Sequence, residues 1–242
     1  MGLEYDDVTD FVHVAIPTRR PGLDRTTPRI IIPAPGNHLP ICFEIPVSGG
    51  QIVKLLEDPS AGIVVRGEVM SRRVRAFQKL GIWYNEEFHI VATPSSVSLT
   101  NNHTLIARWW SWPAANYTSG SVSLAVVDTV LEVTLGSTVL EVLRHRVRHK
   151  DFLWLKIKDH AFGSQASGLT GEFGASVSYT ETTTSPTTAS ISINIKGVSL
   201  NAQRISTVDY GSRVKASEEC WLLEGGGRGL LQPMSQYLVS EL

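Results

Sequence analysis

Short apolar runs, rich in β-branched and aromatic residues, recur along most of this chain and are separated by turn residues. The spacing between runs is about 8–12 residues, which is typical of sandwiches and barrels made of many short strands. The clearest alternation places Ala189, Ile191, Ile193 and Ile195 on one face and polar residues on the other. A period of two marks a half-buried antiparallel strand. No stretch has a convincing helical pattern, so the sequence predicts an all-β fold, an antiparallel β-sandwich.

Turn residues and tryptophans refine this prediction. The sequence Asp58-Pro-Ser-Ala-Gly62 separates two strand-like runs and predicts a hairpin, and Gly168-Leu-Thr-Gly171 predicts another turn. In Trp109-Trp-Ser-Trp112, an extended strand would place Trp110 and Trp112 on the same face. Two interpretations remain for these rings, packing inside the fold or a platform on which a sugar stacks.

Composition limits the function classes. The chain has 242 residues, of which 42% are hydrophobic and 19% charged, with a formal net charge of −1. This balance supports a sizeable core and argues against a globally basic protein, so no nucleic-acid partner is predicted. No apolar run approaches the roughly 20 residues that span a bilayer. The first residues carry acids where a signal peptide has its basic end, so a secreted protein would need a different start.

Domain organisation follows from a change in pattern near residue 28. Residues 1–28 are polar and broken by three prolines, and we interpret them as a linker or N-terminal extension. The alternating runs begin at Arg29 and continue to the end of the sequence. We therefore predict one β domain over residues 29–242.

The cysteines and two sequons bear on the compartment. Cys42 and Cys220 each lie in an apolar strand-like run near opposite ends of the sequence. They are either two buried free thiols or one disulfide that joins the first and last strands, and we favour the disulfide. The sequons Asn102-His-Thr and Asn116-Tyr-Thr predict N-glycosylation and favour, modestly, a secreted protein.

One segment is strongly basic. On a strand, Arg144-His-Arg-Val-Arg-His-Lys150 would place Arg144, Arg146, Arg148 and Lys150 on one face, about 6.8 Å apart, in a line suited to a repeating polyanion. A second basic cluster contains Arg72, Arg73, Arg75 and Lys79. The alternative interpretation is an edge strand whose like charges discourage aggregation.

Catalytic and metal-binding motifs are absent from the sequence. The histidines show no zinc spacing, no Cys-x-x-Cys occurs, and neither a nucleophile elbow nor a phosphate-binding loop is present. We therefore predict a protein that is not an enzyme and that has no cofactor and no metal.

Several motifs, in order, are similar to a known family. They are Pro28-Arg-Ile-Ile-Ile-Pro with Ile41-Cys-Phe-Glu-Ile, Lys79-Leu-Gly-Ile, the stretch Leu143–Phe173 with its His-Arg-Val and Gly-Leu-Thr-Gly-Glu-Phe, and Glu219-Cys-Trp-Leu-Leu followed by Gly229-Leu-Leu and Tyr237-Leu-Val. Over residues 27–242, the sequence resembles the C-terminal domain of inter-alpha-trypsin inhibitor heavy chains. The Gly-Leu-Thr-Gly sequence also resembles the Gly-Leu-Cys-Gly of von Willebrand factor type D domains, which implies a type D-like sandwich.

The resemblance implies a secreted protein of plasma and extracellular matrix, with a von Willebrand type A domain upstream. In that family the C-terminal region is a propeptide, removed by cleavage between an aspartate and a proline. The new terminal aspartate is esterified to chondroitin sulfate and then transferred to hyaluronan. The implied partners are these glycosaminoglycans and other extracellular proteins, and protease inhibition belongs to a separate light chain.

The sequence departs from the family pattern at the cleavage position. Thr27 stands where the family has aspartate, before Pro28, and Arg29 replaces a histidine. Threonine has no carboxylate to form an ester, so we expect neither cleavage nor glycosaminoglycan attachment there. Asp58-Pro59 is an intact Asp-Pro pair, but it matches a different part of the family sequence. The Gly-Leu-Thr-Gly sequence lacks the type D cysteine, so no calcium site is expected.

Overall fold

Almost every regular element of the structure is a strand. The computed structural model describes residues 29–34, 39–70, 76–110, 112, 114–147, 150–159, 162–174, 177–181, 190–195, 197–208, 217–223 and 233–242. These residues contain one short helix, α1 (Gly168–Gly174), and one 3-10 turn, η2 (Met234–Gln236), beside the strands. The all-β prediction is confirmed. The extension over residues 1–28 lies outside the described residues.

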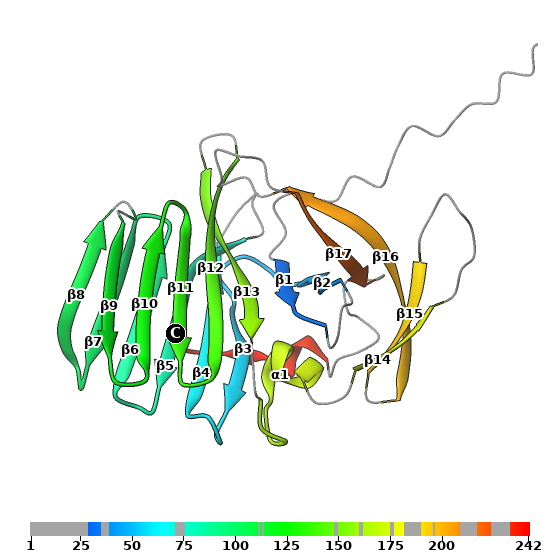
Figure 1. Cartoon of the computed structure of the whole chain (residues 1–242), viewed down its shortest axis with the longest axis horizontal. Helices are drawn as coiled ribbons and strands as arrows, with labels where there is room; N and C mark the ends of the chain where they lie inside the picture. Colours follow the sequence, from blue (N-terminus) through cyan, green and yellow to red (C-terminus); the bar gives the residue numbers. More distant parts are fainter. Residues whose placement is uncertain are drawn as a thin grey trace, which may run out of the picture.

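The described strands form one continuous sheet of 18 strands, which consists of two runs. The first run has the order β9 (Ala115–Ser119), β10 (Val122–Val127), β11 (Val130–Leu135), β12 (Thr138–Val147), β13 (Lys150–Asp159), β1 (Arg29–Ile32), β2 (Ile41–Glu44), β17 (Ser217–Leu223), β16 (Val198–Val208), β15 (Ser190–Ile195) and β14 (Val177–Glu181). The second run has the order β18 (Leu238–Val239), β3 (Ile52–Asp58), β4 (Ile63–Val69), β5 (Phe77–Tyr84), β6 (Phe88–Thr93), β7 (Ser96–Asn101) and β8 (Thr104–Trp110). They are joined where Leu153 of β13 pairs with Phe77 of β5, and Figure 1 shows the second run behind the left-hand part of the first.

The prediction of an antiparallel sheet is wrong at two places. Strand β1 pairs with β13 in parallel, and β17 pairs with β2 in parallel. Parallel neighbours need a long connection between them. Here most of the sequence forms these connections, because β1 and β2 come more than a hundred residues before their partners β13 and β17. Sequence periodicity reports which face of a strand is buried, and it carries no information about a partner so far away.

Local hairpins account for most of the remaining pairs. The links after β7, β9, β10 and β11 have two residues each, and the first of the two has a positive φ. These first residues are Asn102 (φ 45°), Gly120 (57°), Asp128 (54°) and Gly136 (59°). Such turns match the right-handed twist of the flanking strands and favour Asn, Asp and Gly. The alternating pattern of β15 is confirmed as well, because Ile191 and Ile193 are buried.

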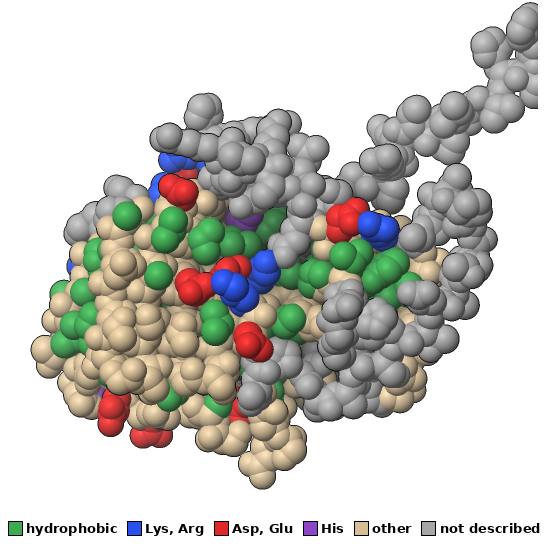
Figure 2. All heavy atoms as spheres, viewed as in Figure 1, with side chains coloured by type: hydrophobic (Ala, Val, Ile, Leu, Met, Phe, Trp, Pro, Cys, Tyr) green, Lys and Arg blue, Asp and Glu red, His purple; other side chains and the backbone are tan. Residues whose placement is uncertain are grey.

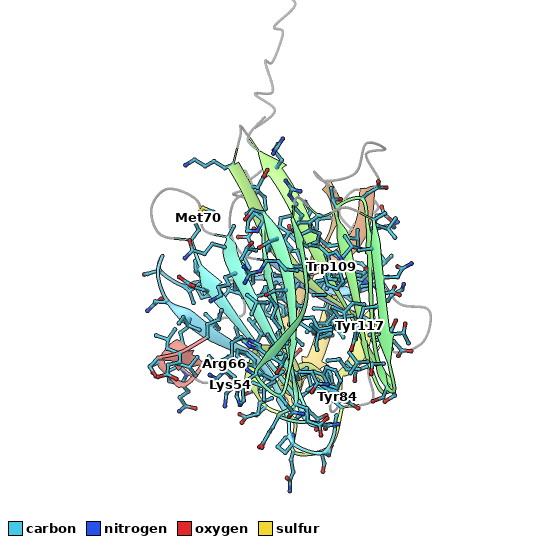
Figure 3. All side chains as sticks on the ribbon, turned by 90° about the vertical axis from the view of Figure 1, so that its left-hand side faces the viewer. Lys54, Arg66, Met70, Tyr84, Trp109 and Tyr117 are labelled. Carbon is cyan, nitrogen blue, oxygen red and sulfur yellow. A yellow bond between two sulfur atoms is a disulfide. The ribbon has the colours of Figure 1, made fainter. Side chains whose placement is uncertain are left out.

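Buried side chains from both runs form one apolar cluster. Trp109 of β8 and Tyr117 of β9 pack against the cluster at the end where the two runs have their edge strands, and Figure 3 shows these two side chains close together there. The expectation that Trp110 and Trp112 share a strand face is wrong, because β8 ends at Trp110 and Trp112 has φ 52°. Trp112 is buried, and its Nε1 donates to the Thr93 carbonyl at 2.8 Å, so this ring packs inside the fold.

Cys42 and Cys220 form a disulfide, as the sequence predicts. The bond joins β2 to its parallel neighbour β17, with the two Cα atoms 5.8 Å apart. These are not the first and last strands of the protein, because β1 and β18 lie outside them in sequence. Both cysteines are fully buried and cluster with Ile31, so the disulfide is shielded from solvent.

The Gly168-Leu-Thr-Gly171 sequence forms the start of helix α1, so the prediction of a turn is wrong. Thr170 is fully buried, and its hydroxyl donates to the Leu55 carbonyl at 2.8 Å. Leu55 is the extra residue of a β-bulge in β3, since Lys54 and Leu56 pair with Arg66 and Val65. A bulge leaves a residue outside the regular ladder, and the helix uses the carbonyl that this bulge releases. A seven-residue helix is too short for its period to be visible in sequence.

Gly168 permits this contact, which leads to a stability prediction. Its φ is 86°, and a Cβ added there would lie 2.9 Å from the Leu55 oxygen. We expect Gly168→Ala to lower the free energy of unfolding by about 2–3 kcal/mol, from left-handed strain and steric conflict together. Gly50 has nearly the same φ, 83°, with no atom within 4 Å of an added Cβ. Gly50→Ala should therefore cost only about 1 kcal/mol in urea denaturation, and equal losses would contradict the role of the contact.

The predicted hairpin at Asp58 is confirmed, and its carboxylate is fully buried. Oδ1 accepts hydrogen bonds from the Ser60 hydroxyl at 2.6 Å, the Ser60 amide at 3.0 Å and the Ala61 amide at 3.3 Å. Oδ2 accepts from the Gly163 amide at 2.8 Å. Burial alone would raise the pKa of this carboxyl, but the hydrogen bonds outweigh burial and hold the pKa below its usual value. Asp58 thus ties the β3–β4 turn to the segment that precedes α1.

Candidate polyanion-binding site

The basic segment 144–150 is a hairpin rather than one strand, so the prediction of four cations in a line is wrong. Arg144 and Arg146 lie near the end of β12, which finishes at Val147, and Lys150 begins β13 opposite Val147. Arg148 lies outside the described residues. The backbone reverses where the sequence pattern continues, because a run of charged residues with no glycine or proline carries no turn signal. The cations of this segment are therefore grouped around a hairpin tip.

Asp151 lies between the two arginines. Arg146 makes two contacts with it, from Nε to Oδ1 at 2.6 Å and from one terminal nitrogen to Oδ2 at 2.9 Å. Arg144 reaches the same Oδ2 at 3.0 Å. The side chain of Arg146 is 65% exposed and that of Arg144 only 19%, so Arg146 is the one that presents its guanidinium to solvent. Lys150, at the tip, is also exposed.

The shared carboxylate changes the electrostatics of the hairpin. Its hydrogen bond from Arg146, aided by Arg144 and opposed by burial, holds the pKa of Asp151 below its usual value. The same contact raises the pKa of Arg146. Asp151 stays ionised at neutral pH and cancels one of the two positive charges. Sequence reasoning missed this residue, although an acid just after the basic run was visible as a candidate partner.

A small apolar cluster beneath the hairpin fixes its position. His145 is buried, with its ring centroid 4.1 Å from that of Trp154 and 5.4 Å from that of Phe152. Ala76 belongs to the same cluster, and Met70 packs against it. The Met70 amide donates to the Ala76 carbonyl at 2.7 Å. These two residues flank the part of the second basic cluster that contains Arg72, Arg73 and Arg75, so the described ends of that part lie beside the β12–β13 hairpin. The three arginines lie outside the described residues, and Lys79, the fourth cation of the cluster, is on β5.

Further along the same strands, charges of both signs alternate. Lys158 of β13 lies 2.6 Å from Glu132 of β11 and 3.4 Å from Glu141 of β12, and the first contact is the main cause of its raised pKa. Lys156 lies 3.7 Å from Glu141. Figure 2 shows acidic and basic side chains in mixed groups on this face. Among the described residues of β11, β12 and β13, positive charge therefore exceeds negative charge only at the hairpin tip, where Arg144, Arg146 and Lys150 face one acid, Asp151.

A groove on the second run was not foreseen from the sequence. It has a volume of about 800 Å³ and is lined by residues that include Arg66, Trp83 and His89. The His89 ring stacks on Trp83 at 4.4 Å, and the Arg66 guanidinium lies 5.2 Å from the Trp83 ring centre. Burial, and then the charge of Lys79, lower the pKa of His89. Because Trp83 and His89 are opposite one another on β5 and β6, only the strand register could have revealed this pair.

Other predicted site residues have varied positions. Asn102 and Asn116 are exposed, in the β7–β8 turn and on β9 respectively. Thr27 and Pro28 lie outside the described residues. Across the described part of the sequence, no group of His, Cys, Asp and Glu is arranged to hold a metal ion. Among the same residues, no helix is long and apolar enough to cross a membrane.

Comparison with known proteins identifies the family. A family model that describes the C-terminus of the inter-alpha-trypsin inhibitor heavy chain matches residues 61–225, more than half of the 242 residues. The protein belongs to this heavy-chain family. The matched range contains the residues of the β12–β13 hairpin and of helix α1, and it contains Cys220.

Individual relatives agree with the family match. The sequence is 28% identical to human inter-alpha-trypsin inhibitor heavy chain H1 over 94% of its length, and 27% identical to human heavy chain H2 over 89%. It is 26% identical to bovine heavy chain H3 over 89%. These alignments cover 27%, 25% and 27% of the relatives, so the protein spans about a quarter of the heavy chains that it matches. No solved structure matches it.

Proposed function

We propose that this protein is a non-enzymatic, extracellular module of a heavy-chain-like protein that contributes to the organisation of hyaluronan-containing matrix. The family assignment, the buried disulfide and the two exposed sequons support secretion. We further propose that residues 29–242 form one type D-like sandwich domain. Since Thr27 has no carboxylate, the module stays attached to whatever precedes it, without the Asp-Pro cleavage and ester linkage of the family.

We propose that its contact with a glycosaminoglycan, hyaluronan or chondroitin sulfate, is made by the hairpin tip. The observation that carries this proposal is the exposed, oriented guanidinium of Arg146, with the exposed Lys150 at the same hairpin tip. Asp151 holds that side chain in one geometry, which lowers the conformational entropy lost on binding. Met70 and Ala76, which pack beside the hairpin, support a contribution from Arg72, Arg73 and Arg75.

Charge variants test the site. We expect the double variant Arg146→Gln with Lys150→Gln to lower affinity for heparin and chondroitin sulfate about tenfold at low salt. The number of counterions released on binding, taken from the slope of log affinity against log salt concentration, should fall by about two. Asp151→Asn should raise affinity, because the gain from removing a negative charge that competes for both arginines exceeds the loss of its orienting contacts with Arg146. Lys156→Gln with Lys158→Gln is the matched control, since it also removes two positive charges, at sites already paired with Glu132 and Glu141. Equal binding by all four proteins, measured by calorimetry, would refute the hairpin as the site.

A second candidate function is adhesion or assembly through protein contacts. The observation that favours it is the pair of exposed apolar residues on β8, Leu105 (51% exposed) and Ile106 (46%). Exposed apolar groups on an edge strand are typical of sheet-edge association. Salt separates the two functions, because polyanion binding weakens as ionic strength rises and apolar association does not.

A further inference from the structure

The end of the molecule formed by β8 and β9 has two open sheet edges. Within the described residues, β8 pairs only with β7 and β9 pairs only with β10. Trp109 and Tyr117 close the space between the two runs, as Figure 3 shows. The backbone edges themselves remain uncovered by described strands. An open edge is a template on which a strand of another molecule can pair.

The sequence of β8 makes this edge a particular hazard. Its residues are Thr-Leu-Ile-Ala-Arg-Trp-Trp, with one charge and no proline. A register shift between Leu99 and Thr100 leaves Ile106 without a direct partner on β7, so Leu105 and Ile106 are both exposed although they are consecutive. Apolar segments of high β-propensity and low charge are those that associate when exposed. A single bulge is weak protection for such a strand.

Both predicted sequons lie at this same end. Asn102 is the first residue of the turn that leads into β8, with φ 45°, and Asn116 is the second residue of β9. Both are exposed, and no contact of the described residues includes either side-chain Nδ2. Thr104 and Thr118, the third residues of the two sequons, are exposed as well. Each acceptor therefore has the accessible Asn and Thr that N-glycosylation requires.

We infer that N-linked glycans on Asn102 and Asn116 cover the β8 and β9 edges and keep the module from associating through them. Asn102 lies three residues before Leu105, within about 10 Å along an extended backbone, so the first sugars of its glycan reach the exposed apolar pair. Only four residues separate β8 from β9, so the chain reverses its direction between the two strands. Asn102 therefore lies next to the start of β8, whereas Asn116 lies near the end of β8 and the start of β9. The two glycans together flank the edge.

The modification is a transfer from a lipid-linked oligosaccharide diphosphate. The Nδ2 atom forms a bond to the anomeric carbon of the first sugar and loses one proton to a base of the transferase. The bond from that carbon to the phosphate oxygen breaks, and the polyprenyl diphosphate leaves with the bonding electrons. The inference rests on the proposed extracellular function, because this donor is met only on the secretory route.

Sequon variants with matched controls test the inference. The protein is expressed behind a secretory signal peptide, and site occupancy is read by mass spectrometry as the aspartate that peptide-N-glycosidase leaves at each modified position. Thr104→Val and Thr118→Val remove the sequons with little change of shape, whereas Thr104→Ser and Thr118→Ser retain them. We expect occupied sites and a monomer for the wild type and the serine variants. The double valine variant should shift to dimers and larger species at the same concentration in sedimentation velocity.

A further substitution connects the association to β8. Adding Ile106→Lys to the double valine variant should restore the monomer, because a charge on the edge opposes pairing. Unmodified Asn102 and Asn116, or a valine variant that stays monomeric, would overturn the inference. Occupancy is measured on protein from both cells and medium. Retention in the cell would count against the proposed extracellular function, whereas empty sequons would count against the present inference alone.

Discussion

Replacement of both Cys42 and Cys220 by alanine is expected to lower the free energy of unfolding by about 4 kcal/mol. The two cysteines are separated by 178 positions, and on the chain-entropy model a loop of this length corresponds to about 5 kcal/mol. Part of that value is lost because the denatured state is not a random coil. The melting temperature should fall by about 10 °C, as measured by circular dichroism or calorimetry.

A control separates the crosslink from the packing of the two sulfurs. The wild type, denatured in the presence of a strong reductant, loses the crosslink and retains both side chains. Its stability should lie close to that of the double alanine variant, because the alanines leave only a small cavity beside Ile31. A reduced wild type as stable as the oxidised protein would contradict the assignment of this stability to the bond.

Loss of the Asp58 carboxylate is expected to have the next largest effect. Asp58→Ala leaves donors from Ser60, Ala61 and Gly163 without an acceptor in a buried site, at a cost of about 3 kcal/mol. Asp58→Asn keeps one oxygen and should lose roughly half as much. The measurement is urea denaturation at neutral pH, with the slope checked for two-state behaviour. An alanine variant within 1 kcal/mol of wild type would show that the tie to Gly163 is unimportant.

The same residue predicts part of the acid sensitivity. The folded-state pKa of Asp58 is lower than its unfolded value of about 3.9, so its stabilisation is complete above that pH. It is lost as the pH falls through the lower folded-state pKa. Asp58→Asn should therefore lose less stability than wild type as the solution is acidified below pH 4. Glu57 and Asp151 also have lowered pKa values, but both are present in each protein, so the difference isolates Asp58.

Features that depend on local pattern were predictable from the sequence. Alternation identified β15 with its buried Ile191 and Ile193, and turn residues located the hairpin at Asp58. Two cysteines in apolar runs were enough to suggest the disulfide. The alternation and the turn are each contained within a few neighbouring residues, and cysteine is the residue type that forms disulfides.

Features that depend on distant pairing were not predictable. Helix α1 is anchored where a bulge at Leu55 exposes a carbonyl that accepts a hydrogen bond from Thr170, 115 positions away. The basic segment folds back at a place without glycine or proline, and this brings Asp151 against Arg144 and Arg146. The groove at Trp83 and His89 depends on strand register in the same way. In each case the contact depends on which strands pair in the folded sheet, and this pairing produces no periodic pattern in the sequence.

The position of β1 and β2 also bears on how the protein is made. A ribosome releases these strands first, yet their neighbours β13 and β17 emerge more than a hundred residues later. The hairpins from β3 to β13 are local and are able to form in order during synthesis, because short loops close early. Strands β1 and β2 can pair with each other early but must wait for β13 and β17, and the Cys42–Cys220 bond cannot form until Cys220 has appeared. Oxidation of this pair therefore follows the synthesis of β1 to β16 and of the first part of β17, and only the rest of β17 and β18 remain to be added to the described sheet.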